Sequence, residues 1–329
     1  MIGAKLAVGL PGEEASPSVL EALRRTRAQS LVVFSRNFTS IAQWTRLRHA
    51  LQAALGYHPL IMVDHEGGRV IRFSDGVTRF PDSLTAGKTR EAADVERQGR
   101  TEAEELRRLG VHVNLAPCVD VLEPGGDPVI GDRSYGDDPR RVSTLAAARI
   151  RGLQAGGVAA CAKHFPGLGA VPRDPHKTLP TISLDWPAMD QRHLPSFAAS
   201  IEAGVAMVMS SHVCYPGLGE PPDRPATFSP TLIRDHLRKR LRFSGLILTD
   251  DLEMGALSAF GNMGELAVRA TEAGHDLLLI CSDLAAAHEA VEALRNSYHT
   301  GRLSMSELQE SVARFATVRE KFAGTPLSL

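Results

Sequence analysis

The sequence has few aromatic residues and almost no net charge. Aromatic residues make up 5% of the 329 residues, and 37 basic side chains are balanced by 38 acidic ones, which gives a formal net charge of −1. Proteins that bind nucleic acid use a basic face or stacking aromatic rings, and attraction to an anionic membrane also requires basic charge. We therefore expect neither nucleic acid nor a membrane as a partner.

Cysteines and long apolar runs are also scarce. The chain has four cysteines, and no two of them form a CxxC pair or have the spacing of a zinc site. No apolar run approaches the ~18 residues of a membrane span, and the apolar stretch near the N-terminus is too short for a signal peptide. We therefore expect a soluble protein of the cytoplasm, a reducing compartment in which its thiols stay free. We also expect a monomer.

A repeated pattern organises what is present: an amphipathic helix, a glycine and then a continuous apolar run. Gly110, Gly204 and Gly274 each stand between such a helix and such a run. Glycine after the last helical turn supplies a left-handed cap. Continuous apolar runs that follow helices are typical of parallel strands buried on both faces.

About eight such runs occur, and most are followed by a helical pattern. This alternation predicts one α/β domain over residues 1–329, a (β/α)8 TIM barrel with extra C-terminal helices packed outside. An open doubly wound sheet is the alternative, but no GxGxxG follows the first run. The expected strands lie near residues 4–8, 30–34, 60–63, 111–116, 158–162, 206–209, 246–248 and 276–280, and expected helices include 41–55, 92–109, 141–154, 231–241 and 265–273.

Polar residues follow nearly every expected strand. In a TIM barrel the carboxyl ends of the strands meet at one face, where the active site lies. The sequence therefore predicts a polar pocket above an apolar barrel. In chain order these residues include Asp64, Arg69, Arg72, Asn114, Asp120, Arg133, Lys163, His164, His212, Asp250, Asp251 and Asp283.

The loop after Lys163 and His164 is rich in proline and glycine, and it contains Asp174-Pro175-His176. Pro175 favours an extended backbone at the residue before it, and residues two apart in an extended chain point to the same side. Asp174 and His176 can then lie together, with the carboxylate orienting the imidazole. We interpret them as a proton-transfer pair, although a solvated loop pair is the simpler alternative.

Several chemistries compete for this pocket. The histidines and Asp64 and Asp250 could bind a metal, but Lys163 and Arg133 would oppose a cation. No GxSxG motif indicates an acyl-transfer serine, and residues 261–264 form only a weak phosphate-binding turn. A mixture of Asp, Arg, Lys and His suits the hydroxyls of a sugar. A rigid carboxylate at a strand end, Asp250, then becomes a candidate nucleophile for glycoside cleavage.

Five stretches together resemble a known family. VDHEGGRVIRF, NLAPCVDV, GDRSYGDDP, KHFPGLGAVPRDPHKTLP and LILTDDLEMGA resemble the family 3 glycoside hydrolases, and within them the bacterial β-N-acetylhexosaminidases of the NagZ type. The resemblance runs from about residue 4 to about residue 283. It implies a TIM barrel and a retaining mechanism without a metal or organic cofactor.

The resemblance also implies roles for individual residues. Asp250 is expected to be the nucleophile, and His176, paired with Asp174, the general acid and base. Glu66, Gly67 and Gly68 are expected to shape a turn, and Glu253 and Met254 to border the sugar. Sugar-binding positions are expected at Asp64, Arg72, Arg133, Lys163 and His164.

Two positions depart from the family pattern. Leu168 stands where the family usually has a histidine, and Pro175 stands where it usually has a serine. The first change removes a polar neighbour of the pocket, and the second stiffens a loop that is expected to close over the sugar. Neither change removes a residue with a chemical role.

These residues predict an exo-acting β-N-acetylglucosaminidase that removes GlcNAc from muropeptide fragments in peptidoglycan recycling. The alternatives are a family 3 β-glucosidase or xylosidase, a GlcNAc phosphorylase, and a sugar-binding protein that has lost activity. The expected partner is a small carbohydrate.

Overall fold

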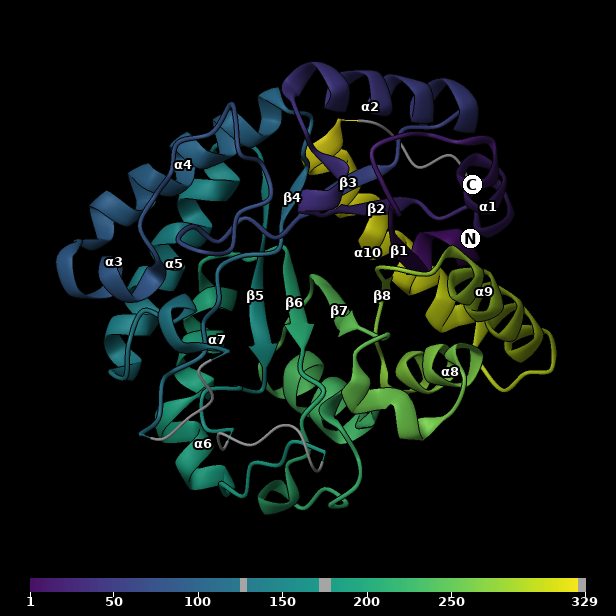
Figure 1. Ribbon diagram of the computed structural model, residues 1–329. Helices are drawn as coiled ribbons and strands as arrows, with labels where there is room; N and C mark the ends of the chain where they lie inside the picture. The colour runs from purple at the N-terminus through teal and green to yellow at the C-terminus, as the bar shows by residue number, and fades with distance from the viewer. Residues whose placement is uncertain (125–128, 172–178, 325–329) are drawn as a thin grey trace.

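The computed structural model describes residues 1–124, 129–171 and 179–324 (Figure 1). In this part of the chain the strands form a closed parallel barrel in the order β1 to β8. β1 pairs with β2 on one side and with β8 on the other, which closes the sheet. The predicted TIM barrel is confirmed, and the alternative of an open doubly wound sheet is wrong.

The strands follow the apolar runs, with shifted ends. Every residue of β1 to β6 and of β8 is buried, as expected for parallel strands covered on both faces. The strands are β1 (Leu6–Gly9), β2 (Ser30–Val33), β3 (Leu60–Val63), β4 (Val113–Asn114), β5 (Ala159–Phe165), β6 (Met207–Ser210), β7 (Leu246–Asp251) and β8 (Leu277–Ile280).

Two differences from the predicted strands bear on the site. β5 continues through Lys163 and His164, and β7 continues through Asp250, so these residues lie in the strands rather than after them. The apolar pattern ends earlier than the strand because Lys163 still pairs with Met209 of β6. A third difference is β4, which is shorter than the apolar run that predicted it.

Helices surround the barrel (Figure 1). Serine side chains at the N-caps of α2 and α10 accept backbone N–H groups of the first turn, which stabilises those helix starts. A wider, π-type helical segment, Thr231–Arg240, precedes β7. The α-helices are α1 (Pro17–Thr26), α2 (Ile41–Leu55), α3 (Ser83–Thr89), α4 (Ala92–Arg108), α5 (Pro139–Ala155), α6 (Trp186–Arg192), α7 (Leu194–Glu202), α8 (Met263–Ala273), α9 (Leu284–His299) and α10 (Met305–Ala323).

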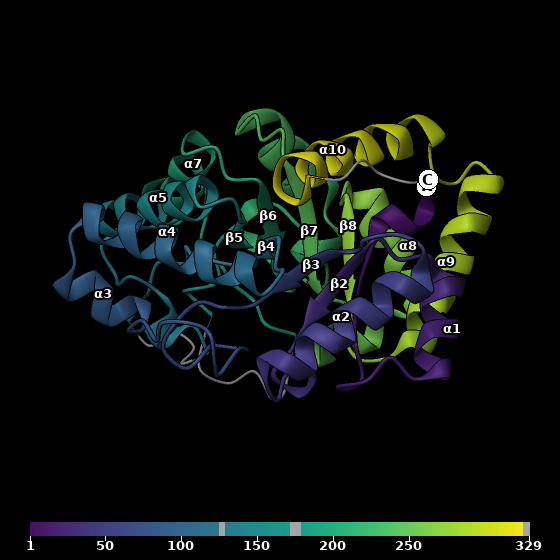
Figure 2. The ribbon, with the colours of Figure 1, turned by 90° about the horizontal axis from the view of Figure 1, so that it is seen from above.

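Helix α10 covers the amino-terminal end of the barrel (Figure 2). Ser311 of α10 accepts a hydrogen bond from the Lys5 ammonium, just before β1, and Arg314 forms an ion pair with Asp276, just before β8. The opposite end, where the strands finish, is therefore the end available for a site. Among the described residues, no helix combines the length and the apolar character that crossing a membrane requires.

Candidate active site

Four charged side chains form a connected network at the carboxyl ends of β3 and β5. The Lys163 ammonium lies 2.7 Å from a carboxylate oxygen of Asp64 and 2.7 Å from one of Glu66. Glu66 also accepts two hydrogen bonds from Arg133, both 2.9 Å long. Lys163 and Glu66 are buried, whereas Asp64 and Arg133 are partly exposed. The exposed members can therefore meet a ligand, and the buried ones hold them in place.

The network fixes the charge of its members. Burial alone would raise the pKa of Glu66, but the Lys163 and Arg133 cations hold it well below its ordinary value. Burial alone would lower the pKa of Lys163, but Asp64 and Glu66 raise it above its ordinary value. Glu66 and Lys163 are therefore both ionised at neutral pH. A set of fixed charges of both signs suits the hydroxyl groups of a sugar, which both donate and accept hydrogen bonds.

A two-glycine turn brings Arg72 back to the same place. Gly67 and Gly68 have positive φ angles of 95° and 55°, and a Cβ atom at Gly68 would lie 2.6 Å from the Cβ of Asp82. Only glycine fits this conformation and this close approach. After the turn, a guanidinium nitrogen of Arg72 lies 3.8 Å from Asp64, so the predicted sugar-binding residues Asp64 and Arg72 are neighbours.

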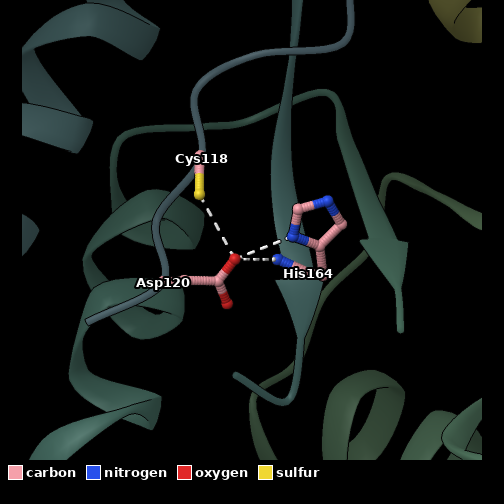
Figure 3. A group of neighbouring side chains, drawn as sticks. All are labelled: Cys118, Asp120 and His164. Carbon is pink, nitrogen blue, oxygen red and sulfur yellow. Dashed lines mark hydrogen bonds and ion pairs between the residues drawn. The ribbon is translucent and has the colours of Figure 1, made fainter. Parts of the chain in front are cut away.

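His164 is held by the buried carboxylate of Asp120, whose orienting role the sequence did not predict (Figure 3). An oxygen of Asp120 lies 2.7 Å from Nδ1 of His164 and accepts the backbone N–H of the same residue. The other oxygen of Asp120 accepts the backbone N–H of Leu168 at 2.6 Å. Because a carboxylate accepts, Nδ1 is the donor, and Nε2 faces the Arg133 guanidinium at 3.4 Å. Asp120 therefore orients His164 toward the charge network.

Cys118, Asp120 and His164 lie close enough together to present three ligand atoms to a metal ion. Their contacts favour hydrogen bonding instead. The Cys118 thiol donates to Asp120 at 3.2 Å, and burial together with the Asp120 charge raises its pKa well above the ordinary value. A metal would require the thiolate in a place where the Arg133 cation already lies beside His164. We therefore interpret the group as a support for the His164 ring.

Asp250 lies near the end of β7, within reach of the same charges. Burial would raise its pKa, but the neighbouring imidazoles of His164 and His212, the Asp251 N–H and the Lys163 ammonium lower it below the ordinary value. The Asp251 N–H donates to an Asp250 carboxylate oxygen at 2.8 Å. The structure thus gives a strand-end carboxylate that is ionised and held by the backbone, as a nucleophile requires.

The neighbouring carboxylates have structural contacts. Asp251 accepts the backbone N–H groups of Glu253 and Cys281, and Glu253 accepts those of Ser282 and Asp283. Both carboxylates therefore hold the segments that follow β7 and β8. Burial raises the pKa of Asp251 to about 6, which separates its ionisation from that of Asp250.

The structure brings together six of the eight predicted site residues, namely Asp64, Arg72, Arg133, Lys163, His164 and Asp250. The other two, Asp174 and His176, lie outside the described residues, and so does Pro175. Leu168 places a partly buried apolar side chain against the core. The roles of Glu66 and Asp120 in fixing the network were missed, although both are acidic residues at predicted strand ends.

A closed eight-stranded barrel with fixed charges at the strand ends defines a (β/α)8 enzyme suited to a polar ligand. The family model described as the glycosyl hydrolase family 3 N terminal domain matches residues 8–318. The chain belongs to this family and is a glycoside hydrolase, so the predicted family and enzyme class are confirmed.

Relatives with known names span most of the chain. A protein named β-hexosaminidase from Nitrosomonas eutropha is 36% identical over 299 residues, which are 88% of this chain and 85% of that protein. A protein of the same name from Methylococcus capsulatus is 38% identical over 291 residues, 87% of this chain and 85% of that protein.

Solved structures share the fold. A family 3 β-N-acetylglucosaminidase from Paenibacillus sp. has a TM-score of 0.93 and 36% identity, and the match covers all of this chain but only 64% of that longer one. NagZ from Neisseria gonorrhoeae, solved in complex with N-trifluoroacetyl-D-glucosamine, has a TM-score of 0.79 and 28% identity, with 95% of this chain and 98% of that chain covered.

Proposed function

We propose that the protein is a retaining exo-β-N-acetylglucosaminidase that removes a terminal GlcNAc from muropeptides or related glycans. The observation on which the proposal mainly depends is the environment of Asp250, a carboxylate near the end of β7 that accepts the Asp251 N–H at 2.8 Å. The nearby His164, His212 and Lys163 side chains lower its pKa although burial opposes this. The names of the relatives support the same sugar, since they are β-hexosaminidases and β-N-acetylglucosaminidases. Residues 1–329 would then act as one TIM-barrel domain.

In the first step, the Asp250 carboxylate attacks the anomeric carbon of the bound sugar. The glycosidic bond breaks as the new C–O bond forms, and His176 gives its proton to the departing oxygen. In the second step, His176 takes a proton from water, and this water attacks the same carbon. The sugar leaves with retained configuration, and Asp250 is again a free carboxylate. Asp174 would orient His176 throughout.

The charge network supports the binding role proposed for its members. Asp64 and Arg133 are partly exposed while their partners Lys163 and Glu66 are buried, so their remaining hydrogen-bonding capacity is directed outward. Arg72 has a buried Nε without a hydrogen-bond partner among the described residues. The exposed atoms of these groups can accept from and donate to adjacent sugar hydroxyls, while Nε2 of His164 lies 3.4 Å from the Arg133 guanidinium. Such fixed groups reduce the entropy lost when the sugar binds.

Aryl glycosides with and without a 2-acetamido group test the proposal. We expect turnover of the N-acetylglucosaminide, and replacement of Asp250 by Ala should remove nearly all of it. A His176→Ala variant should lose roughly 10²- to 10⁴-fold in kcat/KM, the usual contribution of a general acid. Unchanged turnover in the Asp250→Ala variant would refute the mechanism, and preference for a plain glucoside or xyloside would refute the substrate.

Two further measurements test the details. Quantifying free GlcNAc against GlcNAc-1-phosphate in phosphate buffer separates hydrolysis from transfer to phosphate. Comparing a muropeptide with a chitooligosaccharide of equal length tests the assignment to peptidoglycan recycling, which requires that the muropeptide has the higher kcat/KM. A protein that binds GlcNAc but turns over none of these substrates would be a sugar-binding protein.

A further inference from the structure

His212 follows β6 and is buried, with 4% of its surface exposed. Both ring nitrogens have partners. Nε2 lies 2.9 Å from the backbone carbonyl oxygen of Asp251, and Nδ1 lies 2.6 Å from the hydroxyl oxygen of Thr227. The ring therefore connects the segment after β6 to the end of β7, one residue beyond Asp250.

These partners decide the tautomer. A carbonyl oxygen can only accept a hydrogen bond, so Nε2 has the proton. In the neutral ring Nδ1 then accepts the Thr227 hydroxyl proton. If the ring gains a second proton, Thr227 can instead donate to the carbonyl oxygen of Ser211, 2.9 Å from its hydroxyl. In both states Nε2 donates to Asp251, so this bond does not depend on the charge of the ring.

The bond from His212 to Asp251 lies beyond the end of the strand ladder between β6 and β7. The register of β6 and β7 pairs Met209 with Leu248 and stops there. The register of β7 and β8 shifts between Leu248 and Asp251. Within the described residues, the end of β7 that includes Asp250 is thus attached to the β6 side by the His212 side chain rather than by the strand ladder.

The backbone of the same residue, Asp251, also reaches the proposed nucleophile. Asp251 receives the His212 bond at its carbonyl group, and its N–H donates to an Asp250 carboxylate oxygen at 2.8 Å. The side chain of Asp251 is bonded to the backbone N–H of Cys281, directly after β8. His212 and Cys281 therefore hold Asp251 from opposite sides, and Asp251 in turn fixes one oxygen of Asp250.

We propose that His212 is a positioning residue for Asp250, which it orients through the backbone of Asp251. The inference rests on the proposed role of Asp250 as nucleophile. The charged and titratable groups that act on His212 are Asp250 from β7 and His164 from β5, beside the hydrogen bond to the backbone carbonyl of Asp251. His275, before β8, is affected by His212 in turn.

Two amide variants separate this role from a packing role. The amide of Gln at position 212 reaches the place of Nε2 and can still donate to Asp251, whereas the shorter amide of Asn reaches only the place of Nδ1. We expect His212→Gln to keep kcat within about threefold. We expect His212→Asn to lower kcat roughly 10- to 100-fold at an unchanged KM, since a misplaced reacting group costs up to about 10²-fold.

The sugar-binding residues lie on other strands, so KM is the internal control, and the thermal midpoints of both variants test folding. Equal kcat losses in the two variants, or a loss confined to KM, would overturn the inference. Thr227→Val, which removes the Nδ1 partner, should lower kcat more than Thr227→Ser, and this pair keeps the test valid if the Asn variant does not fold.

The outcomes also separate this inference from the proposed function. If Asp250→Ala retains turnover, the proposed function fails whatever the His212 variants do. If Asp250→Ala is inactive and His212→Asn matches the wild type, only the inference about His212 fails.

Discussion

Glu66 is the residue whose replacement tests the charge network most directly. Its carboxylate lies 2.7 Å from the Lys163 ammonium and 2.9 Å from two nitrogens of Arg133, and its side chain is only 3% exposed. In a Glu66→Gln variant the amide oxygen can accept from one cation, but the NH2 group then faces the other. The variant keeps the shape of the side chain and removes the charge that balances two buried or half-buried cations.

The magnitude follows from the burial. Removing one partner of a buried ion pair costs about 3–5 kcal/mol, and Lys163 keeps Asp64 as a partner, so we expect about 3 kcal/mol. At about 2 °C per kcal/mol, the value for large domains, the thermal midpoint at pH 7 should fall by roughly 6 °C. KM should rise as well, because Arg133 and Lys163 lose the group that holds them.

The pH dependence has a definite sign. The pKa of Glu66 is held below its ordinary value, so the stability from its ionised form is present at neutral pH and is lost as the pH falls below about 4.3, the ordinary value for Glu. At pH 3 about 2 kcal/mol of this stabilisation should be lost. The difference between wild type and variant should therefore narrow on acidification.

A neighbouring exposed ion pair provides the control. Arg69 and Asp132 lie 2.7 Å apart with side chains 49% and 39% exposed, and exposed pairs contribute about 0–1 kcal/mol. Asp132→Asn should therefore shift the midpoint by no more than about 2 °C. Calorimetry of the three proteins at pH 7 and pH 3 measures both effects. Equal midpoints for Glu66→Gln and Asp132→Asn at pH 7 would show that the network does not stabilise the fold.

Two further substitutions test the supports of the site. Asp120→Asn should raise KM for the sugar and lower the thermal midpoint, because Asp120 accepts hydrogen bonds from both His164 and Leu168. The control variant Cys118→Ser should change neither KM nor the midpoint by much. Similar effects of the two substitutions would argue against the orienting role of Asp120. Asp251→Asn keeps an oxygen for the two backbone N–H groups but removes a charge whose pKa is raised to about 6 by burial. A carboxyl group whose pKa is raised by folding stabilises the fold at low pH, and this stabilisation is lost as the pH rises through about 6. At pH 8 the free energy of unfolding of the variant should therefore exceed that of the wild type by roughly 1–2 kcal/mol, after a discount for partial exposure. At pH 4 the two free energies should be almost equal. Denaturant unfolding at both pH values measures this, and an equal gain at both would contradict it.

Most of the barrel could be predicted because its signals are local. The glycine caps and apolar runs depend on a few adjacent residues, and each strand of the barrel overlaps a run identified in the sequence. The strand ends could not be predicted equally well. Lys163 continues β5 because it pairs with Met209 across the barrel, and a polar residue gives no local sign of such a partner.

The same contrast between local signals and distant partners applies to the candidate site. The motif residues Asp64, Lys163 and Asp250 could be selected from the sequence because polar residues follow apolar runs there. The pairings among the polar residues could not be predicted, since Glu66 lies near Arg133 and Asp120 lies near His164 only after separate strands meet at one end of the barrel.

The sequence alone determined the number and order of the strand–helix units, the family, and the residue types available for sugar chemistry, because each is encoded in adjacent residues. Only the tertiary structure decided which charges neutralise each other, which carboxylate orients which imidazole, and what holds Asp250 in place. These pairings join segments far apart in the chain, such as His212 and the Asp251 carbonyl, and depend on the distances that barrel closure creates.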